Sequence, residues 1–336
     1  MQTCIINKKL SPNYGWVLIM PLENLKCVNC GCNTSKPLFR KFDLDISQCL
    51  DCSLIFVNPR LPEKDILNRY DDDYFLKEYL PSFGIVDNNY NLDFFDQRYS
   101  TIIDLIEEKR QLSNEKKLLE IGFGAGFFLK SAERAGWDVV GTEASLPCFQ
   151  FASDELSLNV KFEKAEDINF EANTFDVIVM FDVIEHLFNP LRVLKAANNM
   201  LNEGGLLVIS TPNYNALSRL FLGINWSIFS PVDHLFYFTE DSLGDLLNRS
   251  GFSRNFYIRN NAGSGVYETM NPRNSHFPHS LRARFYTTLV NTFGKRALDV
   301  IQRNGRGDVL LSFAYGQKEE AVIQGSLNTS VELNKI

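Results

Sequence analysis

The sequence lacks a surplus of basic residues and any long apolar run. Lys and Arg number 34 against 41 Asp and Glu, which gives a formal net charge of −7. A chain built to neutralise many phosphates is usually basic, so this balance disfavours a dedicated nucleic-acid binder. No apolar stretch reaches the roughly 20 residues of a transmembrane helix, and we therefore expect no membrane insertion.

The start of the chain also lacks the marks of a secretory signal. It carries Lys8 and Lys9, then Pro12, and shows neither an unbroken apolar core nor a small-residue cleavage site. We therefore expect a cytoplasmic protein. Because cytosolic thiols stay reduced, the seven cysteines predict free thiols or metal ligands and not disulfides.

Short apolar runs alternate with helical stretches over most of the chain. The predicted strands are residues 118–121, 139–142, 160–162, 175–181, 206–210, 252–259 and 309–315. Predicted helices include 127–134, 191–201 and a helix that Thr239 opens and Gly251 follows. Such alternation predicts an α/β fold with a doubly wound, mostly parallel, seven-stranded sheet.

We divide the chain into six segments from these patterns. They are a leader (1–26), a cysteine module (27–60), a connector with a helix before the core (61–112), the core (113–260 plus 305–317), a helical insertion (261–304) and a tail that we expect to be disordered (318–336). The stretch 60–83 is predicted to be loosely structured. The insertion either covers the site or builds a contact between two copies, so a homodimer is an open alternative.

The strongest local motif is a strand that runs into three alternate glycines. Gly122, Gly124 and Gly126 follow the strand at 118–121, and a helix starts at Phe127. Glycines allow a tight turn and let a ligand approach the backbone closely. A dinucleotide fingerprint has its third glycine one residue later, where this chain has Phe127. The spacing therefore disfavours a dinucleotide.

Two acidic residues lie at the ends of consecutive strands. Glu120 ends the first, where a carboxylate would repel a pyrophosphate, and Glu143 ends the second, where it would reach the ribose hydroxyls of a nucleoside. S-adenosylmethionine carries a sulfonium, an ammonium and one carboxylate, so its net charge is positive. We therefore predict this cofactor, bound at Glu120, the three glycines and Glu143.

These motifs resemble the class I methyltransferases that depend on S-adenosylmethionine. The matching motifs are 120–126, Glu143, 173–186 and 201–206, and the resemblance covers residues 113–260. It implies a Rossmann-like fold. A fuller resemblance, at 56–60, 74–75 and 233–239, is to a bacterial group with a zinc ribbon before the methyltransferase. Members of that group often act on sugars, polysaccharides or secondary metabolites.

The chain departs from the family where the third strand ends. An Asp beside the adenine ring is frequent there, whereas this segment reads Glu-Lys-Ala-Glu-Asp at 163–167. We assign the adenine contact to the backbone of Ala165 and to Glu166. Asp182, after the fourth strand, is predicted either to accept from the cofactor's ammonium or to face the acceptor. Asn213 either lines the acceptor side or is a turn residue.

The cysteine module contains two close pairs. Cys27 and Cys30 form one and Cys49 and Cys52 the other, with eighteen residues between the pairs. Tetrahedral zinc takes four such thiolates, and a two-residue gap lets a tight turn present both. We predict a structural zinc site, with Cys32 as a spare thiol that could compete as a ligand. The ion either stabilises a segment that is too small to fold alone, or the module around it forms one side of the acceptor pocket.

Two of the four histidines are candidates for removing a proton from the acceptor. Methyl transfer needs an aligned nucleophile, and imidazole titrates in the range that suits a general base. His234 lies in the loop after the fifth strand, and such loops line the site in these sheets. His186 begins a helix after the fourth strand. For each, the competing role is to order its loop by hydrogen bonding.

The predicted acceptor is a small molecule, a sugar or secondary metabolite methylated on oxygen. The alternative is C- or N-methylation of a nucleotide-linked sugar. A nucleic-acid methyltransferase that docks through the ribbon is less favoured, because the amino-group motif of such enzymes is absent from 181–184. A non-catalytic protein that keeps the pocket is disfavoured by the intact acidic pair. The apolar stretch 217–226 is either a lid or a packed helix.

Overall fold

The structure is a computed structural model that describes residues 22–67, 73, 75–85, 89–110, 116–257, 288, 292, 300–301 and 303–316. Its main element is a seven-stranded sheet of order β10-β11-β8-β7-β4-β5-β6. The strands are β4 Lys117–Ile121, β5 Asp138–Glu143, β6 Val160–Phe162, β7 Phe175–Phe181, β8 Leu201–Pro212, β10 Phe252–Tyr257 and β11 Val309–Gly316. Five adjacent strands are parallel, and β11 runs antiparallel to both of its neighbours. The predicted mostly parallel seven-stranded sheet is confirmed.

The predicted strands are all present, and the largest difference is at the start of β8. This strand begins at Leu201 and not at residue 206. Leu201 pairs with Phe175 across an irregularity before the regular ladder resumes at Val177 and Leu206. The turn before the fifth strand is therefore incorporated into the sheet.

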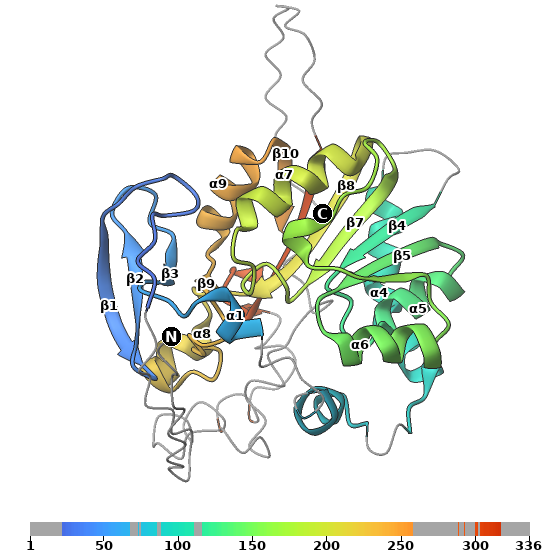
Figure 1. The fold of residues 1–336 in the computed structure, drawn as a ribbon, viewed down its shortest axis with the longest axis horizontal. Coiled ribbons are helices and arrows are strands. Elements are labelled where there is room, and N and C mark those ends of the chain that lie inside the picture. The colour runs from blue at the N-terminus through green and yellow to red at the C-terminus, as the bar shows by residue number, and fades with distance from the viewer. Residues whose placement is uncertain are drawn as a thin grey trace, which may run out of the picture.

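Both faces of the sheet are buried, as alternation along β7 shows. Val177 and Val179 pack in one hydrophobic cluster, and Ile178 and Met180 pack in the other. Helices α4 Leu92–Lys109, α5 Phe127–Arg134 and α6 Leu146–Gln150, with η2 Phe151–Glu155, contribute to the first cluster, and α7 Pro190–Met200 and α9 Glu240–Arg249 to the second. Figure 1 shows these two helical layers on either side of the sheet. The strands are therefore apolar throughout, as parallel strands covered on both faces must be.

The cysteine module forms a second, smaller sheet of order β1-β2-β3-β9. Its strands are β1 Ser35–Lys41, β2 Leu44–Cys49, β3 Ile55–Val57 and β9 Phe236–Tyr237. The fourth strand comes from a distant part of the chain, between β8 and α9. It pairs antiparallel with β3, so the small sheet lies against the main domain (Figure 1).

The prediction of a loosely structured connector over 60–83 is wrong for its described residues. They form α1 Glu63–Leu67, η1 Phe75–Tyr79 and α3 Leu80–Ser82. Ring contacts explain the order, because Phe75 packs on Phe151 and Phe83 packs on Phe95 and Phe127. Aromatic burial in tertiary contacts thus outweighs the weak local propensity of this segment.

The apolar stretch at 217–226 is a packed helical segment. It forms α8 Leu217–Leu222 and η4 Gly223–Asn225, after which Trp226 is fully buried. Asn213 is a turn residue, because its side-chain oxygen accepts from the backbone N–H of Asn215, while its amide donates to the carbonyls of Gly305 and Gly307. Neither alternative that placed these residues at the acceptor is supported.

The described parts of the chain contain no helix with the length and apolarity needed to cross a bilayer. Most of the predicted insertion at 261–304, most of the leader and the tail from residue 317 lie outside the described residues.

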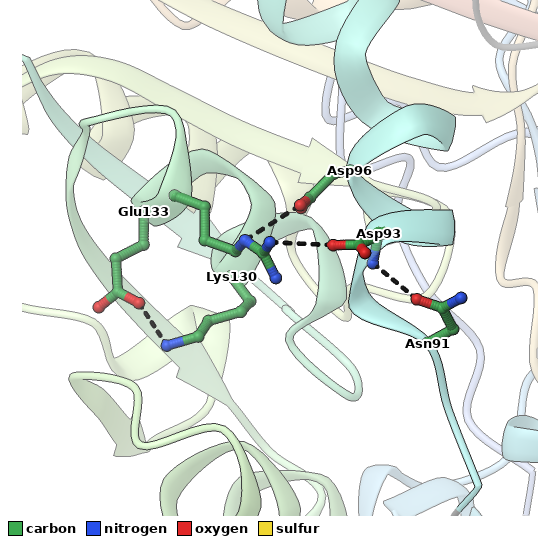
Figure 2. A network of polar contacts seen from close by, with 6 residues as sticks. Asn91, Asp93, Asp96, Lys130 and Glu133 are labelled. Carbon is green, nitrogen blue, oxygen red and sulfur yellow. Dashed lines mark hydrogen bonds and ion pairs between the residues drawn. The ribbon is translucent and has the colours of Figure 1, made fainter.

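The helix before the core is tied to α5 by a polar network (Figure 2). Arg134 on α5 lies 3.0 Å from a carboxylate oxygen of Asp93 and 3.0 Å from one of Asp96, both on α4. Asn91 caps α4 by accepting from the backbone N–H of Asp93. Exposed pairs of this kind stabilise a fold by less than about 1 kcal/mol each, so apolar packing contributes more than they do to holding α4 against α5.

We expect core packing in β8 to dominate the stability of the domain. Leu207 is fully buried in this central strand, and Leu207→Ala should lower the free energy of unfolding by about 2–5 kcal/mol. Leu220→Ala on α8 is the matched control, because Leu220 is 53% exposed, and its effect should stay within about 0.5 kcal/mol. Denaturant titration of both variants measures the difference, and equal losses would contradict this account of the core.

Candidate active site and cysteine cluster

A cavity of about 790 Å³ opens at the carboxyl ends of β4, β5 and β7. Its lining includes Glu120, Gly122, Gly124, Glu143, Ala165, Glu166, Asp182 and His186, and thus most of the residues that the sequence predicts to bind cofactor or act on the acceptor. Gly126 and His234 are not in the lining. Gly126 instead precedes α5 in a left-handed conformation, and His234 lies behind His186.

The glycine turn leaves no room for a side chain at its centre. Gly124 has a φ of +57°, and a Cβ placed there would overlap the hydroxyl of Tyr79. The same hydroxyl lies 3.4 Å from the backbone nitrogen of Ala125, which donates to it. Only glycine therefore satisfies both the backbone angle and the close approach.

The two acidic residues meet at this turn. Glu120 is 3% exposed, and one of its carboxylate oxygens has no hydrogen-bond partner among the described residues. Glu143 accepts from the backbone N–H groups of Gly124 at 2.9 Å and of Ser145 at 2.8 Å. These bonds hold the Glu143 carboxylate where β5 ends.

Burial makes both carboxylates reluctant to ionise. Desolvation, followed by the nearby charge of Glu143, raises the pKa of Glu120 well above its ordinary value. Desolvation also raises the pKa of Glu143, against the lowering effect of its bonds from Ser145 and Gly124. A cation in the cavity would relieve this cost, because it would stabilise the charged carboxylates.

The cavity as a whole is acidic. Among the described residues, five acidic side chains line it, namely Glu120, Glu143, Glu163, Glu166 and Asp182, against the two basic side chains Arg98 and Lys164. A pyrophosphate would meet net repulsion here, whereas a cationic nucleoside would not.

The remaining predicted cofactor residues lie around the same cavity with distinct local roles. The carboxylate of Glu166 accepts from the backbone N–H of Phe188 at 2.7 Å, which ties η3 Ala165–Asp167 to the segment before α7. Asp182 has a φ of +54° and accepts from the hydroxyl of Ser210 at 3.0 Å. Asp182 therefore lines the cavity from a strained turn where β7 ends.

His186 and His234 pack against each other at the other end of the cavity. Their ring centroids are 4.7 Å apart in an edge-to-face arrangement. Nδ1 of His186 lies 2.9 Å from the carbonyl of Asp233, and Nδ1 of His234 lies 2.9 Å from the carbonyl of Ile228. Desolvation lowers the pKa of His186, and desolvation together with His186 lowers that of His234 to about 3. Both imidazoles are therefore neutral at pH 7.

The loop that carries His234 is held between the small sheet and the β7 exit. The backbone N–H of Val57 in β3 donates to the carbonyl of Leu235, and the N–H of Leu235 donates to the carbonyl of Glu185. This connection runs from the cysteine module to the residue that precedes His186. The sequence alone could not reveal it, because β9 has only two residues.

The four predicted metal ligands come together. Sulfur atoms of Cys27, Cys30, Cys49 and Cys52 all lie within 4.8 Å of one another, and the set fits a single tetrahedral ion. Cys32 is not part of this group, and its sulfur contacts Thr34 instead.

Both cysteine pairs sit on the same kind of turn. The N–H of Cys27 donates to the carbonyl of Cys32, five residues on, and the N–H of Cys49 donates to that of Leu54, also five residues on. Gly31 and Ser53, at matching places, both have positive φ. Two equivalent turns therefore present the thiols to a common centre.

Sequence reasoning missed Tyr79, Phe83, Arg98 and Tyr99, which line the cavity from the segment before the core. They come from η1, the end of α3 and α4. The only sequence signal was the density of aromatic residues in that segment, which does not say what the rings pack against.

A comparison with protein families matches residues 94–254 to a family described as a methyltransferase domain. The matched range covers slightly less than half of the chain, and residues 94–254 are thus similar to a methyltransferase domain. The glycine turn, Glu120, Glu143 and the β7 exit all fall inside the matched range. Tyr79 and the cysteine cluster lie outside the matched range.

Curated relatives of the methyltransferase domain include two bacterial proteins named ubiquinone biosynthesis O-methyltransferase. The protein of Cereibacter sphaeroides (strain ATCC 17025) is 32% identical over 146 residues, which are 40% of this chain and 59% of the relative. That of Ruegeria pomeroyi is 32% identical over 161 residues, or 43% of this chain and 65% of the relative. The chain thus spans less than two thirds of the length of these relatives.

Solved structures similar to the chain include a SAM-dependent methyltransferase from Archaeoglobus fulgidus. It is 18% identical, has a TM-score of 0.48, and the match covers 73% of this chain and all of that one.

We expect Glu120 to lower the stability of the ligand-free protein. Its raised pKa means that folding is favoured while the group is protonated, and that this contribution is lost as pH rises above the ordinary carboxyl range. Glu120→Gln should therefore be about 1–3 kcal/mol more stable than wild type at pH 7, and the gap should close near about pH 4. Thermal melts across pH measure it. A pH-independent difference would show that burial of the charge is not the cause.

Proposed function

We propose that the chain transfers the methyl group of S-adenosylmethionine to an oxygen atom of a small molecule. The observation that supports it most is the acidic cavity at the glycine turn, where Glu120 has an unpartnered, buried carboxylate oxygen. A cationic cofactor would satisfy this oxygen, and the two carboxylates would replace water around it. We place Glu143 near the ribose and Ala165 and Glu166 near the adenine; the position of these residues at the carboxyl ends of neighbouring strands supports this placement.

The acceptor side is assigned to the end of the cavity that contains Asp182 and His186. When bound, the cofactor supplies a methyl group on a sulfonium for in-line displacement. His186 and His234, as neutral imidazoles, keep a nitrogen lone pair that can receive the acceptor's proton. His186 faces the cavity and His234 supports it from behind, so we give the two histidines a joint role.

Oxygen as the methylated atom is supported by the relatives, which are named O-methyltransferases. A sugar or secondary metabolite is the proposed acceptor class. The same names do not extend to this chain as a whole, because the match leaves out the cysteine module and the segment that contains Tyr79.

Cofactor binding is tested by calorimetry with S-adenosylmethionine on the full chain. Glu143→Ala removes a charged hydrogen-bond acceptor, and losing a bond of this type costs about 1.5–3 kcal/mol, so affinity should fall by about tenfold to a hundredfold. Glu203→Ala, at an exposed position, should bind like wild type. Equal affinity in the wild type and in Glu143→Ala would remove the proposed cofactor site.

The acceptor is tested with radiolabelled cofactor against metabolite extracts, with nucleic acid as the competing substrate. We expect the label to appear in small molecules, and we expect only the wild-type protein to transfer it at the full rate. His186→Asn and His234→Asn should slow turnover by about 10²–10⁴-fold while leaving the affinity for S-adenosylmethionine unchanged. Label in nucleic acid, or full turnover in both variants, would contradict the proposed acceptor side.

We further propose that the cysteine cluster holds a structural zinc ion. The support is the equivalence of the two turns and the gathering of four sulfur atoms. Four thiolates leave no open position on the ion, so its contribution is to stability, and through β3 and β9 to the position of His234.

Zinc content per chain tests this second proposal. Cys49→Ser should lose one equivalent of zinc relative to wild type and should melt at a lower temperature, because the small sheet loses its cross-link. Cys32→Ser should keep the wild-type zinc content, since Cys32 contacts Thr34 and not the cluster. Equal zinc content in Cys49→Ser and wild type would refute the assignment.

A further inference from the structure

A second group of metal-ligating side chains lies at the acceptor end of the cavity. Glu185, His186 and His234 each offer one ligand atom, and these three atoms lie within 4.8 Å of one another. Glu185 and His186 follow β7, whereas His234 immediately precedes the segment that forms β9. The fold thus brings together two imidazoles and one carboxylate from distant parts of the chain.

Both imidazoles are oriented as metal ligands usually are. A carbonyl oxygen can only accept, so the contacts to Asp233 and Ile228 place a hydrogen on Nδ1 of His186 and on Nδ1 of His234. The lone pair is then on Nε2 of each ring. Histidine ligands typically donate their second ring N–H to a backbone carbonyl in this way, which fixes the tautomer and the ring orientation.

The carboxylate of Glu185 provides independent evidence for a bound cation. Glu185 is 1% exposed, and one of its oxygens accepts from the hydroxyl of Thr211 at 2.9 Å. The other oxygen is buried and has no hydrogen-bond partner among the described residues. A buried carboxylate oxygen without a partner is costly, and a bound cation would remove that cost.

We propose that Glu185, His186 and His234 bind a divalent transition-metal ion, with zinc as the reference case. Two imidazoles and one carboxylate form a set that leaves a coordination position open, unlike the four cysteines. His186 lines the cavity, so the open position faces the place assigned to the acceptor.

This inference rests on the proposed function and revises how the proton is removed: with the ion bound, the lone pairs of His186 and His234 hold the metal, and the metal replaces the imidazoles as the group that promotes loss of the acceptor's proton. An acceptor hydroxyl that binds the ion becomes more acidic, because the positive charge stabilises the oxyanion. The hydroxyl's proton then passes to solvent, and the oxygen is positioned for the methyl group. The acceptor class is accordingly one with an accessible hydroxyl that can ligate a metal.

The test uses Co²⁺ as the probe on the full chain with its cysteine cluster filled with zinc. Wild type should bind one equivalent of Co²⁺ and give weak visible bands without the intense sulfur-to-metal absorption of a thiolate site. Glu185→Gln and His234→Asn should each weaken Co²⁺ binding at least tenfold. Glu203→Gln is the matched control for Glu185→Gln and should bind Co²⁺ like wild type.

The affinity for S-adenosylmethionine is measured in every variant as a check on folding, and His234→Asn remains informative if Glu185→Gln does not fold. Absence of Co²⁺ binding in wild type, or unchanged binding in both variants, would overturn the metal site. Full methyl transfer by wild type after removal of loosely bound metal would also overturn it while leaving the proposed function intact. Failure to bind S-adenosylmethionine would instead count against the proposed function.

Discussion

The burial of carboxyl groups at the carboxyl edge of the parallel sheet is the constraint on which the rest of the structure depends. Glu120, Glu143 and Glu185 all lie where β4, β5 and β7 end, and desolvation raises the pKa of each. Burying carboxylates at these positions lowers the free energy of unfolding. A cation bound at this edge, as proposed for the cofactor and the metal ion, would stabilise the charged carboxylates and so offset the cost of burying them.

A second constraint is the short strand pair that joins the two sheets. Ile55 pairs with Tyr237 and Phe56 with Phe236, so the cysteine module is built onto the main domain. The loop that carries His234 enters β9 directly. Because the small sheet shares its apolar cluster with α7 and α9, the cysteine turns, the β9 pairing and the loop that carries His234 form one packed unit.

The sequence predicted the parallel sheet well because its signals are local. Neighbouring residues carry these signals: the apolar runs that must be buried on both faces, the glycines at the first turn and the helix cap at Thr239. The acidic residues at the ends of β4 and β5 could be placed because strand ends share one edge. Glu185 was not singled out, since a lone carboxylate next to a histidine has no motif of its own. Tyr79 was missed because its role depends on contact with Gly124, a glycine far along the chain.

By itself, the sequence determined where the strands lie along the chain, the glycine turn, the acidic pair at its edge and the spacing of four cysteines, all of which depend on short-range patterns. Only the tertiary structure decided that His186 and not His234 lines the cavity, that the segment before the core covers it with aromatic rings, and that β9 completes the small sheet. These features arise from packing between residues distant in the chain, and such contacts leave no periodic signal to read.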